Sequence, residues 1–211
     1  MAKLIFLPGA SGRKAMWDTW VDCFKREYST TVVGWPGLDN EPEDSSILEI
    51  GDLSQLVSKH IEPHSVLIAQ SMGGVVALHT LLENKGSVAA LILCVTSGGL
   101  DRTEFDCENW RPDFVRNNPG TPAWFLDHDE DLSQTWATIS VPVLLIWGGD
   151  DRISPVAMGN RLNQLIPDSS LLVIQGAGHD VAETHVEQLL PVVSDFLRKA
   201  LGELSPVGSI S

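Results

Sequence analysis

Ser71 stands where one apolar run of the sequence ends and a second begins. Residues 66–69 form a short aliphatic run typical of a buried strand, and the apolar run from Val75 favours a buried helix. Small residues around Ser71 let a strand and a helix approach closely on a tight, strained turn that exposes the serine hydroxyl. The N–H groups of such a helix N-terminus would stabilise an oxyanion. Ser71 is therefore a candidate nucleophile, although a serine here also suits a simple helix cap.

A histidine and a pair of aspartates follow two other strand-like runs. Asp150 and Asp151 come directly after the apolar run 143–147, where either carboxylate would be placed to orient an imidazole. His179 follows the run 171–174, and the glycines before it leave its ring free to reach across the end of a sheet. A lone histidine in such a loop is usually structural, but this one accompanies a serine and a carboxylate at strand ends. Together they indicate nucleophilic catalysis with His179 as the base.

The first strand-like run, residues 4–7, ends in Pro8-Gly9-Ala10-Ser11-Gly12. Small residues directly after a strand let backbone N–H groups point into a cleft, which would suit an oxyanion. A plain glycine turn explains the same residues equally well.

The cysteines and the remaining histidines predict neither a disulfide framework nor a metal site. Three cysteines is an odd number, and none of them forms a C-x-x-C pair, so we expect a protein of the reducing cytoplasm. No other histidine forms a ligand cluster with cysteines or carboxylates. Those histidines are His60, His64, His79, His128 and His185.

The charge balance restricts the possible partners. With 14 basic and 28 acidic residues, the chain has a formal charge of −14. Such a charge argues against nucleic acid, anionic membranes and acidic protein partners such as carrier proteins. The N-terminus lacks the long apolar region of a signal peptide, and no run reaches transmembrane length, so no membrane association is expected.

Strand-like and helical patterns alternate along the 211 residues. Strand-like runs cover residues 4–7, 31–33, 66–69, 89–95, 143–147 and 171–174. Helical patterns cover residues 15–27, 47–60, 72–83, 155–165 and 184–201. This alternation predicts an α/β fold with a doubly wound parallel sheet of about six strands and helices on both faces. The candidate residues would then gather at the carboxyl ends of the strands.

Residues 97–140 interrupt this alternation. The segment mixes turn residues with aromatic residues, among them Trp110 and Trp124, which argues against disorder. We interpret it as a short lid that covers a cleft; the alternative is that its aromatic side chains pack on the core. The predicted organisation is a single domain over residues 1–204, with the lid inserted at 97–140 and a flexible tail at 205–211.

Taken together, these segments resemble the α/β-hydrolase family over residues 3–200. The order serine, aspartate, histidine is that of the family's triad. Pro8-Gly9-Ala10 resembles its oxyanion loop, although the family usually has a histidine where this chain has Pro8. The segment 147–155 resembles the family's Gly-x-x-Asp-x-x-x-Pro pattern, whose spacing selects Asp151 over Asp150. Gly176-Ala177-Gly178-His179 matches the histidine loop.

The resemblance implies a triad of Ser71, His179 and Asp151, with an oxyanion hole formed by the N–H groups of Ala10 and Met72. It implies no metal and no organic cofactor. Trp17, Trp110 and Trp124 are candidates for lining the substrate pocket. The family's first antiparallel strand pair has no counterpart here, so we expect a minimal fold with the strand order 2-1-3-4-5-6. The short lid would leave the cleft open to varied substrates.

The implied function is hydrolysis of a small or medium carboxylic ester through an acyl-enzyme. The alternatives are a thioesterase, a carrier-protein esterase or a carbon–carbon hydrolase of the same fold, and a lyase like that of menaquinone biosynthesis. A non-catalytic ligand receptor is a further alternative, but such scaffolds tend to lose the serine or the histidine. We expect a small-molecule substrate and a monomer or homodimer.

Overall fold

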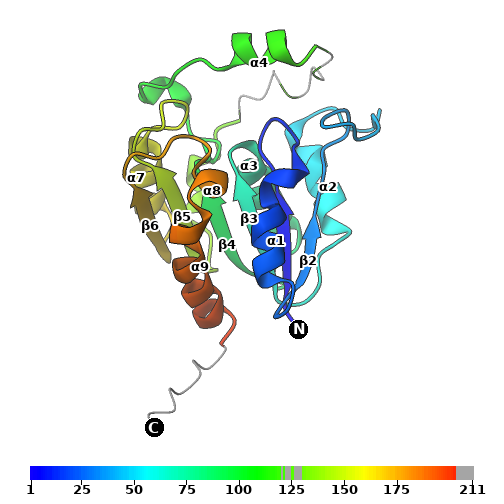
Figure 1. Cartoon of the computed structure of the whole chain (residues 1–211), viewed down its shortest axis with the longest axis vertical. Coiled ribbons are helices and arrows are strands. Elements are labelled where there is room, and N and C mark those ends of the chain that lie inside the picture. Colours follow the sequence, from blue (N-terminus) through cyan, green and yellow to red (C-terminus); the bar gives the residue numbers. More distant parts are fainter. Residues whose placement is uncertain (120, 122–124, 126–129, 203–211) are drawn as a thin grey trace.

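Six parallel strands form one sheet through the centre of the chain (Figure 1). The computed structural model describes residues 1–119, 121, 125 and 130–202. The strands are β1 (Lys3–Leu7), β2 (Ser29–Val32), β3 (Ser65–Gln70), β4 (Val88–Cys94), β5 (Val143–Gly148) and β6 (Ser169–Ile174). Their order is β2-β1-β3-β4-β5-β6, which confirms the predicted fold class and strand order.

The strands end along a common edge, and this register gathers the loops that follow them. Ala69 of β3 lies opposite Leu7 of β1 and Leu93 of β4. Cys94 of β4 lies opposite Ile146 of β5. The loops after β1, β3, β4 and β5 therefore begin side by side, which is where an open α/β sheet places a ligand site.

The central strands are the ones that the sequence predicts best, because both of their faces are covered. Every residue of β3 and β5 is buried, so their sequences read as continuous apolar runs. The edge strands β2 and β6 begin with Ser29 and Ser169 and are only partly buried. Their first residues lack an apolar pattern, and the predicted runs therefore start two residues too late.

Helices cover both faces of the sheet. The α-helices are α1 (Asp18–Phe24), α2 (Leu53–Ser58), α3 (Met72–Glu83), α4 (Arg111–Asn117), α6 (Ser133–Trp136), α7 (Val156–Leu165), α8 (Val181–Thr184) and α9 (Val186–Ala200). The described part of the chain also contains the 3-10 helices η1 (Lys14–Trp17), η2 (Ile50–Asp52) and η3 (Arg102–Glu104). Helices α1 and α9 contact each other on one face, while α2, α3 and α7 pack on the other (Figure 1). None of the described helices is long and apolar enough to cross a membrane.

Three predicted helices prove to be composite. The pattern 15–27 is divided into η1 and α1, 47–60 contains only η2 and α2, and 184–201 corresponds to the end of α8 followed by α9. Leu48 accounts for part of the second error, because its side chain is exposed in the loop before η2 although its position fits an apolar helical face. By contrast, α3 has the predicted bounds, since its apolar residues continue without interruption from the turn at Ser71.

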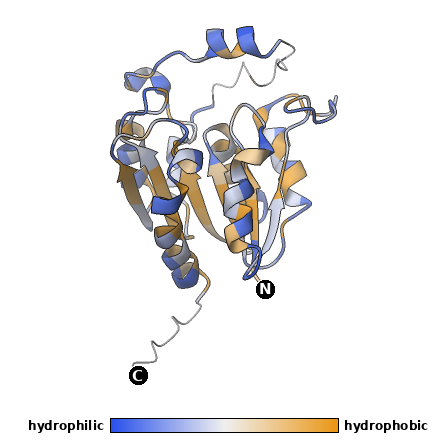
Figure 2. Ribbon diagram, in the orientation of Figure 1, coloured by the Kyte–Doolittle hydropathy of each residue, from blue (hydrophilic) through white to orange (hydrophobic). Residues whose placement is uncertain are grey.

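Apolar residues concentrate in the sheet and on the inner sides of the helices, with polar residues outside (Figure 2). Five of the described tryptophans are completely buried, and four of their indole N–H groups donate hydrogen bonds to main-chain carbonyls. Trp35 donates to Pro8 after β1, Trp136 to Gly98 after β4, and Trp147 to Ser154 after β5. These bonds tie the loops at the carboxyl edge of the sheet to the core.

The segment after β4 crosses above the carboxyl edge of the sheet, where it carries α4 (Figure 1). Four of its described aromatic side chains occupy two different environments. Trp136 is buried in the core, whereas Trp110, Phe114 and Phe125 stack on one another with ring centroids 5.1–5.6 Å apart. A lid function for residues 97–140 stays a prediction, and the predicted tail at 205–211 lies outside the described residues.

Candidate active site

Ser71 occupies a strained turn between β3 and α3. Its backbone has φ 53° and ψ −120°, a conformation that costs energy for any residue with a β-carbon. Two glycines make the turn possible. A β-carbon on Gly73 would lie 2.7 Å from the Pro8 carbonyl oxygen, and one on Gly74 would lie 2.4 Å from Thr96 Oγ1. The start of α3 thus packs directly against the loops after β1 and β4.

The Ser71 hydroxyl does not cap α3. No side-chain capping hydrogen bond forms at this helix N-terminus. The hydroxyl oxygen instead lies 3.0 Å from His179 Nε2. The interpretation of Ser71 as a simple cap therefore does not agree with the structure.

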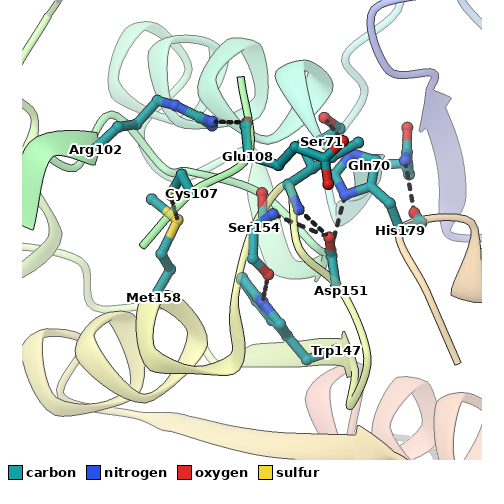
Figure 3. Close-up of polar contacts among 11 residues, drawn as sticks. Gln70, Ser71, Arg102, Cys107, Glu108, Trp147, Asp151, Ser154, Met158 and His179 are labelled. Atoms are coloured by element: carbon teal, nitrogen blue, oxygen red, sulfur yellow. Dashed lines mark hydrogen bonds and ion pairs between the residues drawn. The ribbon is translucent and has the colours of Figure 1, made fainter. Parts of the chain in front are cut away.

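His179 connects the serine to a buried carboxylate. Its Nδ1 lies 2.8 Å from Asp151 Oδ2, so the imidazole bridges Ser71 and Asp151 (Figure 3). The three side chains come from the loops after β3, β5 and β6, which are far apart in sequence and adjacent at the edge of the sheet.

Of the two neighbouring aspartates, the structure brings Asp151 to the histidine. Its side chain is 0% exposed, and Oδ1 accepts hydrogen bonds from the N–H groups of Ile153 at 2.8 Å and Ser154 at 3.0 Å. Asp150 is exposed, and its N–H donates to the Ala177 carbonyl. The carboxylate of Asp151 is therefore held by the main chain in the orientation that its bond to His179 requires.

Ala10 and Met72, whose backbone N–H groups form the predicted oxyanion hole, line the same cavity as Ser71. Met72 is the first residue of α3, where an N–H group has no partner within the helix. Ala10 lies in the loop after β1, and its N–H donates no main-chain hydrogen bond among the described residues. Trp35 Nε1 holds this loop by donating to the carbonyls of Pro8 at 3.0 Å and Gly9 at 3.2 Å. Sequence reasoning missed this role of Trp35, which only its position in space reveals.

A cavity of about 610 Å³ opens beside the serine. Ser71, Ala10 and Met72 line it, and Trp110 and Phe125 contribute aromatic lining from the segment after β4. Phe125 was not singled out from the sequence, although it belongs to the aromatic segment that predicted a cleft. Three carboxylates and two arginines also line the cavity, namely Asp101, Glu130, Asp131, Arg102 and Arg111.

Three tryptophans were predicted to line the substrate pocket, and the structure places the two described ones differently. Trp110 lines the cavity. The prediction that Trp17 lines the pocket is wrong. Its side chain is completely buried and packs against Phe6 and Trp20, with ring centroids 5.4 Å apart in each pair. It follows the loop after β1 in sequence, but η1 turns its ring into the core. Trp124 lies outside the described residues.

Alternative catalytic groups receive little support in the described part of the chain. Burial raises the pKa of the Cys94 thiol to about 12, so it stays protonated and unreactive at neutral pH. Among the described residues, histidine, cysteine, aspartate and glutamate form no group that would hold a metal ion.

Comparison with known sequences identifies the family of the chain. Residues 4–132 match the Alpha/beta hydrolase family, and residues 120–186 match a second description, alpha/beta hydrolase fold. A 2-hydroxy-6-oxononadienedioate/2-hydroxy-6-oxononatrienedioate hydrolase from Burkholderia vietnamiensis is 36% identical over 86 residues, which are 41% of this chain and 28% of that protein. A pimeloyl-[acyl-carrier protein] methyl ester esterase from Neisseria meningitidis is 23% identical over 247 aligned positions, covering 96% of this chain and 79% of that protein.

Solved structures share the same architecture. A thermophilic esterase from Thermogutta terrifontis superposes with a TM-score of 0.77 at 19% identity, covering 95% of this chain and 90% of that one. MenH from S. aureus superposes with a TM-score of 0.76 at 18% identity, covering 95% and 94%. At these identities the superpositions show the fold alone. The family model that matches residues 4–132 covers more than half of the chain, and the chain therefore belongs to the Alpha/beta hydrolase family.

Proposed function

We propose that this protein is a serine esterase that hydrolyses a carboxylic ester with a small or medium acyl group. The observation that carries the proposal is the continuous hydrogen-bonded path from Ser71 Oγ through His179 to the buried Asp151. This path supplies a nucleophile, a base and a group that orients the base.

In the first half of the reaction, His179 Nε2 takes the Ser71 proton while Oγ attacks the acyl carbon. Asp151 keeps Nδ1 protonated and stabilises the imidazolium that forms. The negative charge that develops on the carbonyl oxygen would be stabilised by the N–H groups of Ala10 and Met72. Loss of one such donor typically costs about 3–4 kcal/mol of transition-state stabilisation.

The second half returns the enzyme to its starting state. His179 donates its proton to the leaving alcohol oxygen as the carbon–oxygen bond breaks, which leaves the acyl group on Ser71. A water molecule then gives a proton to His179 and attacks the acyl carbon. This attack forms a tetrahedral intermediate. When it collapses, the bond between the acyl carbon and Ser71 Oγ breaks, His179 returns its proton to Oγ, and the acid is released.

The cavity supports a small-molecule ester. Its volume of about 610 Å³ lies within the usual range of small-ligand sites. Met72, Val75, Trp110 and Phe125 give it apolar walls that suit an acyl chain. The formal charge of −14 disfavours docking of an acidic carrier protein, so a free ester is the better candidate than a carrier-bound one.

A carbon–carbon hydrolase is the second candidate, because the sequence is 36% identical to a hydrolase named for a 2-hydroxy-6-oxo dienedioate over 86 residues. The same serine and histidine would serve that reaction. The chemistry differs in the bond that breaks, so substrates distinguish the two candidates directly.

The test is hydrolysis of p-nitrophenyl esters from acetate to dodecanoate, beside a 2-hydroxy-6-oxo dienoate substrate. Ser71→Ala is the inactive variant, and Ser97→Ala is the matched control, since Ser97 lines the same cavity without contacting His179. We expect ester turnover that Ser71→Ala abolishes and Ser97→Ala retains. Turnover of the dienoate alone would favour the second candidate, and ester turnover that survives in Ser71→Ala would overturn the proposal.

A further inference from the structure

Gln70 ends β3 directly before Ser71, and its side chain lies between two loops of the site. The residue is only 8% exposed. Its Nε2 donates a hydrogen bond to the His179 carbonyl at 3.2 Å (Figure 3). Among the described residues, the His179 carbonyl accepts no other hydrogen bond. The amide of Gln70 is thus the direct link between the nucleophile's strand and the main chain of the histidine.

The other side of the same amide lies against the loop after β1. A β-carbon on Gly9 would stand 2.0 Å from Gln70 Oε1, so the side-chain oxygen fills the space above the Gly9 α-carbon. Gln70 is therefore wedged between the loop that carries Ala10 and the loop that carries His179. The sequence did not predict this role, because no local pattern around Ser71 indicates which distant main-chain groups Gln70 would contact.

A small cavity of about 260 Å³ lies between the two loops, with Gln70 and His179 among its lining residues. At its rim, Arg13 forms a bidentate ion pair with Glu183, with one bond of 2.9 Å between Nη1 and Oε1. This ion pair also spans the two loops, but it is exposed and does not touch His179.

We propose that Gln70 is a positioning residue that holds His179 in register with Ser71. Gln70 and Ser71 are consecutive residues, so few rotatable bonds separate the Gln70 amide from the Ser71 hydroxyl. A hydrogen bond from Gln70 to the His179 main chain therefore restricts the distance between His179 and Ser71. Displacement of a reacting group by about 1 Å can cost about a hundredfold in rate. The expected loss of kcat rests on the proposed esterase function. The placement of His179 by Gln70 does not depend on which substrate the protein uses.

The test compares two variants. Gln70→Met keeps the length of the side chain and removes the hydrogen-bond donor. Glu183→Gln removes the negative charge from the exposed ion pair with Arg13. In Gln70→Met we expect kcat on the best ester to fall about tenfold or more, with KM within about twofold because Gln70 does not line the substrate cavity. In Glu183→Gln we expect both constants to stay within about twofold of wild type. Gln70→Glu, which is closest in shape, replaces Gln70→Met if the latter fails to fold.

A second readout needs no substrate. The proton between His179 Nδ1 and Asp151 gives a downfield NMR signal when the imidazole is held in place. We expect this signal to broaden or disappear in Gln70→Met and to remain in Glu183→Gln. An unchanged signal in the folded Gln70 variants would overturn the proposal, whatever happens to kcat. If wild type hydrolyses no ester, the proposed function fails while the NMR comparison still decides the role of Gln70.

Discussion

Gly148 packs so closely against Gly178 that a β-carbon on Gly148 would lie 2.3 Å from the Gly178 carbonyl oxygen. This contact places the end of β5, which leads into the loop of Asp151, against the loop that carries His179. The 2.8 Å bond between Asp151 and His179 joins the same two loops.

Gly148→Ala should separate these loops. The new methyl group meets main-chain atoms that cannot move alone, so we expect a loss of about 1–3 kcal/mol in the free energy of unfolding and a lower kcat. Urea unfolding and ester turnover measure both effects. Gly178→Ala is the matched control, because its β-carbon would meet only Asp180 Oδ1 at 3.6 Å. Equal losses in the two variants would show that the close approach is not what matters.

Asp151→Asn should lower kcat far more than Asp150→Asn. Asparagine at position 151 cannot hold the imidazole with Nδ1 protonated, and the comparable change in another serine hydrolase costs about ten-thousandfold. Asp150 is exposed, and its replacement should change kcat by less than about twofold. Turnover of a p-nitrophenyl ester by the two purified variants gives the comparison. A larger loss in Asp150→Asn would transfer the role to that residue.

Gly9→Ala and Gln70→Ala should be strongly coupled. Alone, Gly9→Ala places a methyl group 2.0 Å from Gln70 Oε1 and should destabilise the protein by about 1–3 kcal/mol. Gln70→Ala removes that oxygen, so the same glycine substitution should cost much less in this background. Unfolding in urea of the four proteins of the cycle measures the coupling. Additive losses would mean that the loop after β1 relaxes around the new methyl group.

Trp110→Ala should change the acyl preference. The indole lines the cavity, and its removal leaves room for a longer acyl chain. We expect the ratio of kcat/KM for long over short p-nitrophenyl esters to rise by about tenfold. Phe114→Ala is the control, because Phe114 stacks on Trp110 without being a lining residue. An unchanged ratio in Trp110→Ala would show that the acyl chain binds elsewhere.

The ion pair between Arg13 and Glu183 should contribute stability only above acid pH. The hydrogen bond from Arg13 lowers the pKa of the Glu183 carboxyl from its ordinary value of 4.5. A carboxyl whose pKa is lower in the folded than in the unfolded state stabilises the fold above the unfolded pKa, and this contribution disappears as the pH falls through the folded pKa. Both side chains are partly exposed, so the contribution is less than about 1 kcal/mol.

Calorimetry of wild type and Glu183→Gln at neutral and acid pH measures this contribution. The variant should have the lower Tm at neutral pH, and the difference should vanish in acid. Glu187→Gln is the control, since Glu187 is exposed and has no ion pair in the described part of the chain. A Tm difference that persists in acid would point to a role for Glu183 other than its charge.

Local sequence patterns were sufficient to predict the central strands of the sheet and the turn between β3 and α3. The continuous apolar runs of β3, β4 and β5 identify buried parallel strands, because such strands have both faces covered. The break at Ser71 marks the end of β3 and the start of α3, since a serine and two glycines between apolar runs permit a tight turn from a strand into a helix. Alternation of strand and helix then predicts a parallel sheet with loops that meet at one edge, whereas the strand order was predicted from the resemblance to the α/β-hydrolase family. The residues around His179 and Asp151 were found in the same way, and their catalytic roles stay predictions.

The tertiary structure alone decided which side chains lie beside the serine. Trp17 and Trp110 both have plausible sequence positions, yet η1 turns Trp17 into the core while the segment after β4 brings Trp110 to the cavity. The choice of Asp151 rested on family spacing until the main-chain N–H groups of Ile153 and Ser154 showed how its carboxylate is oriented. Gln70 and Trp35 act across distances of 109 and 27 residues. Contacts of this kind depend on how separate elements pack, and no local pattern of residues encodes them.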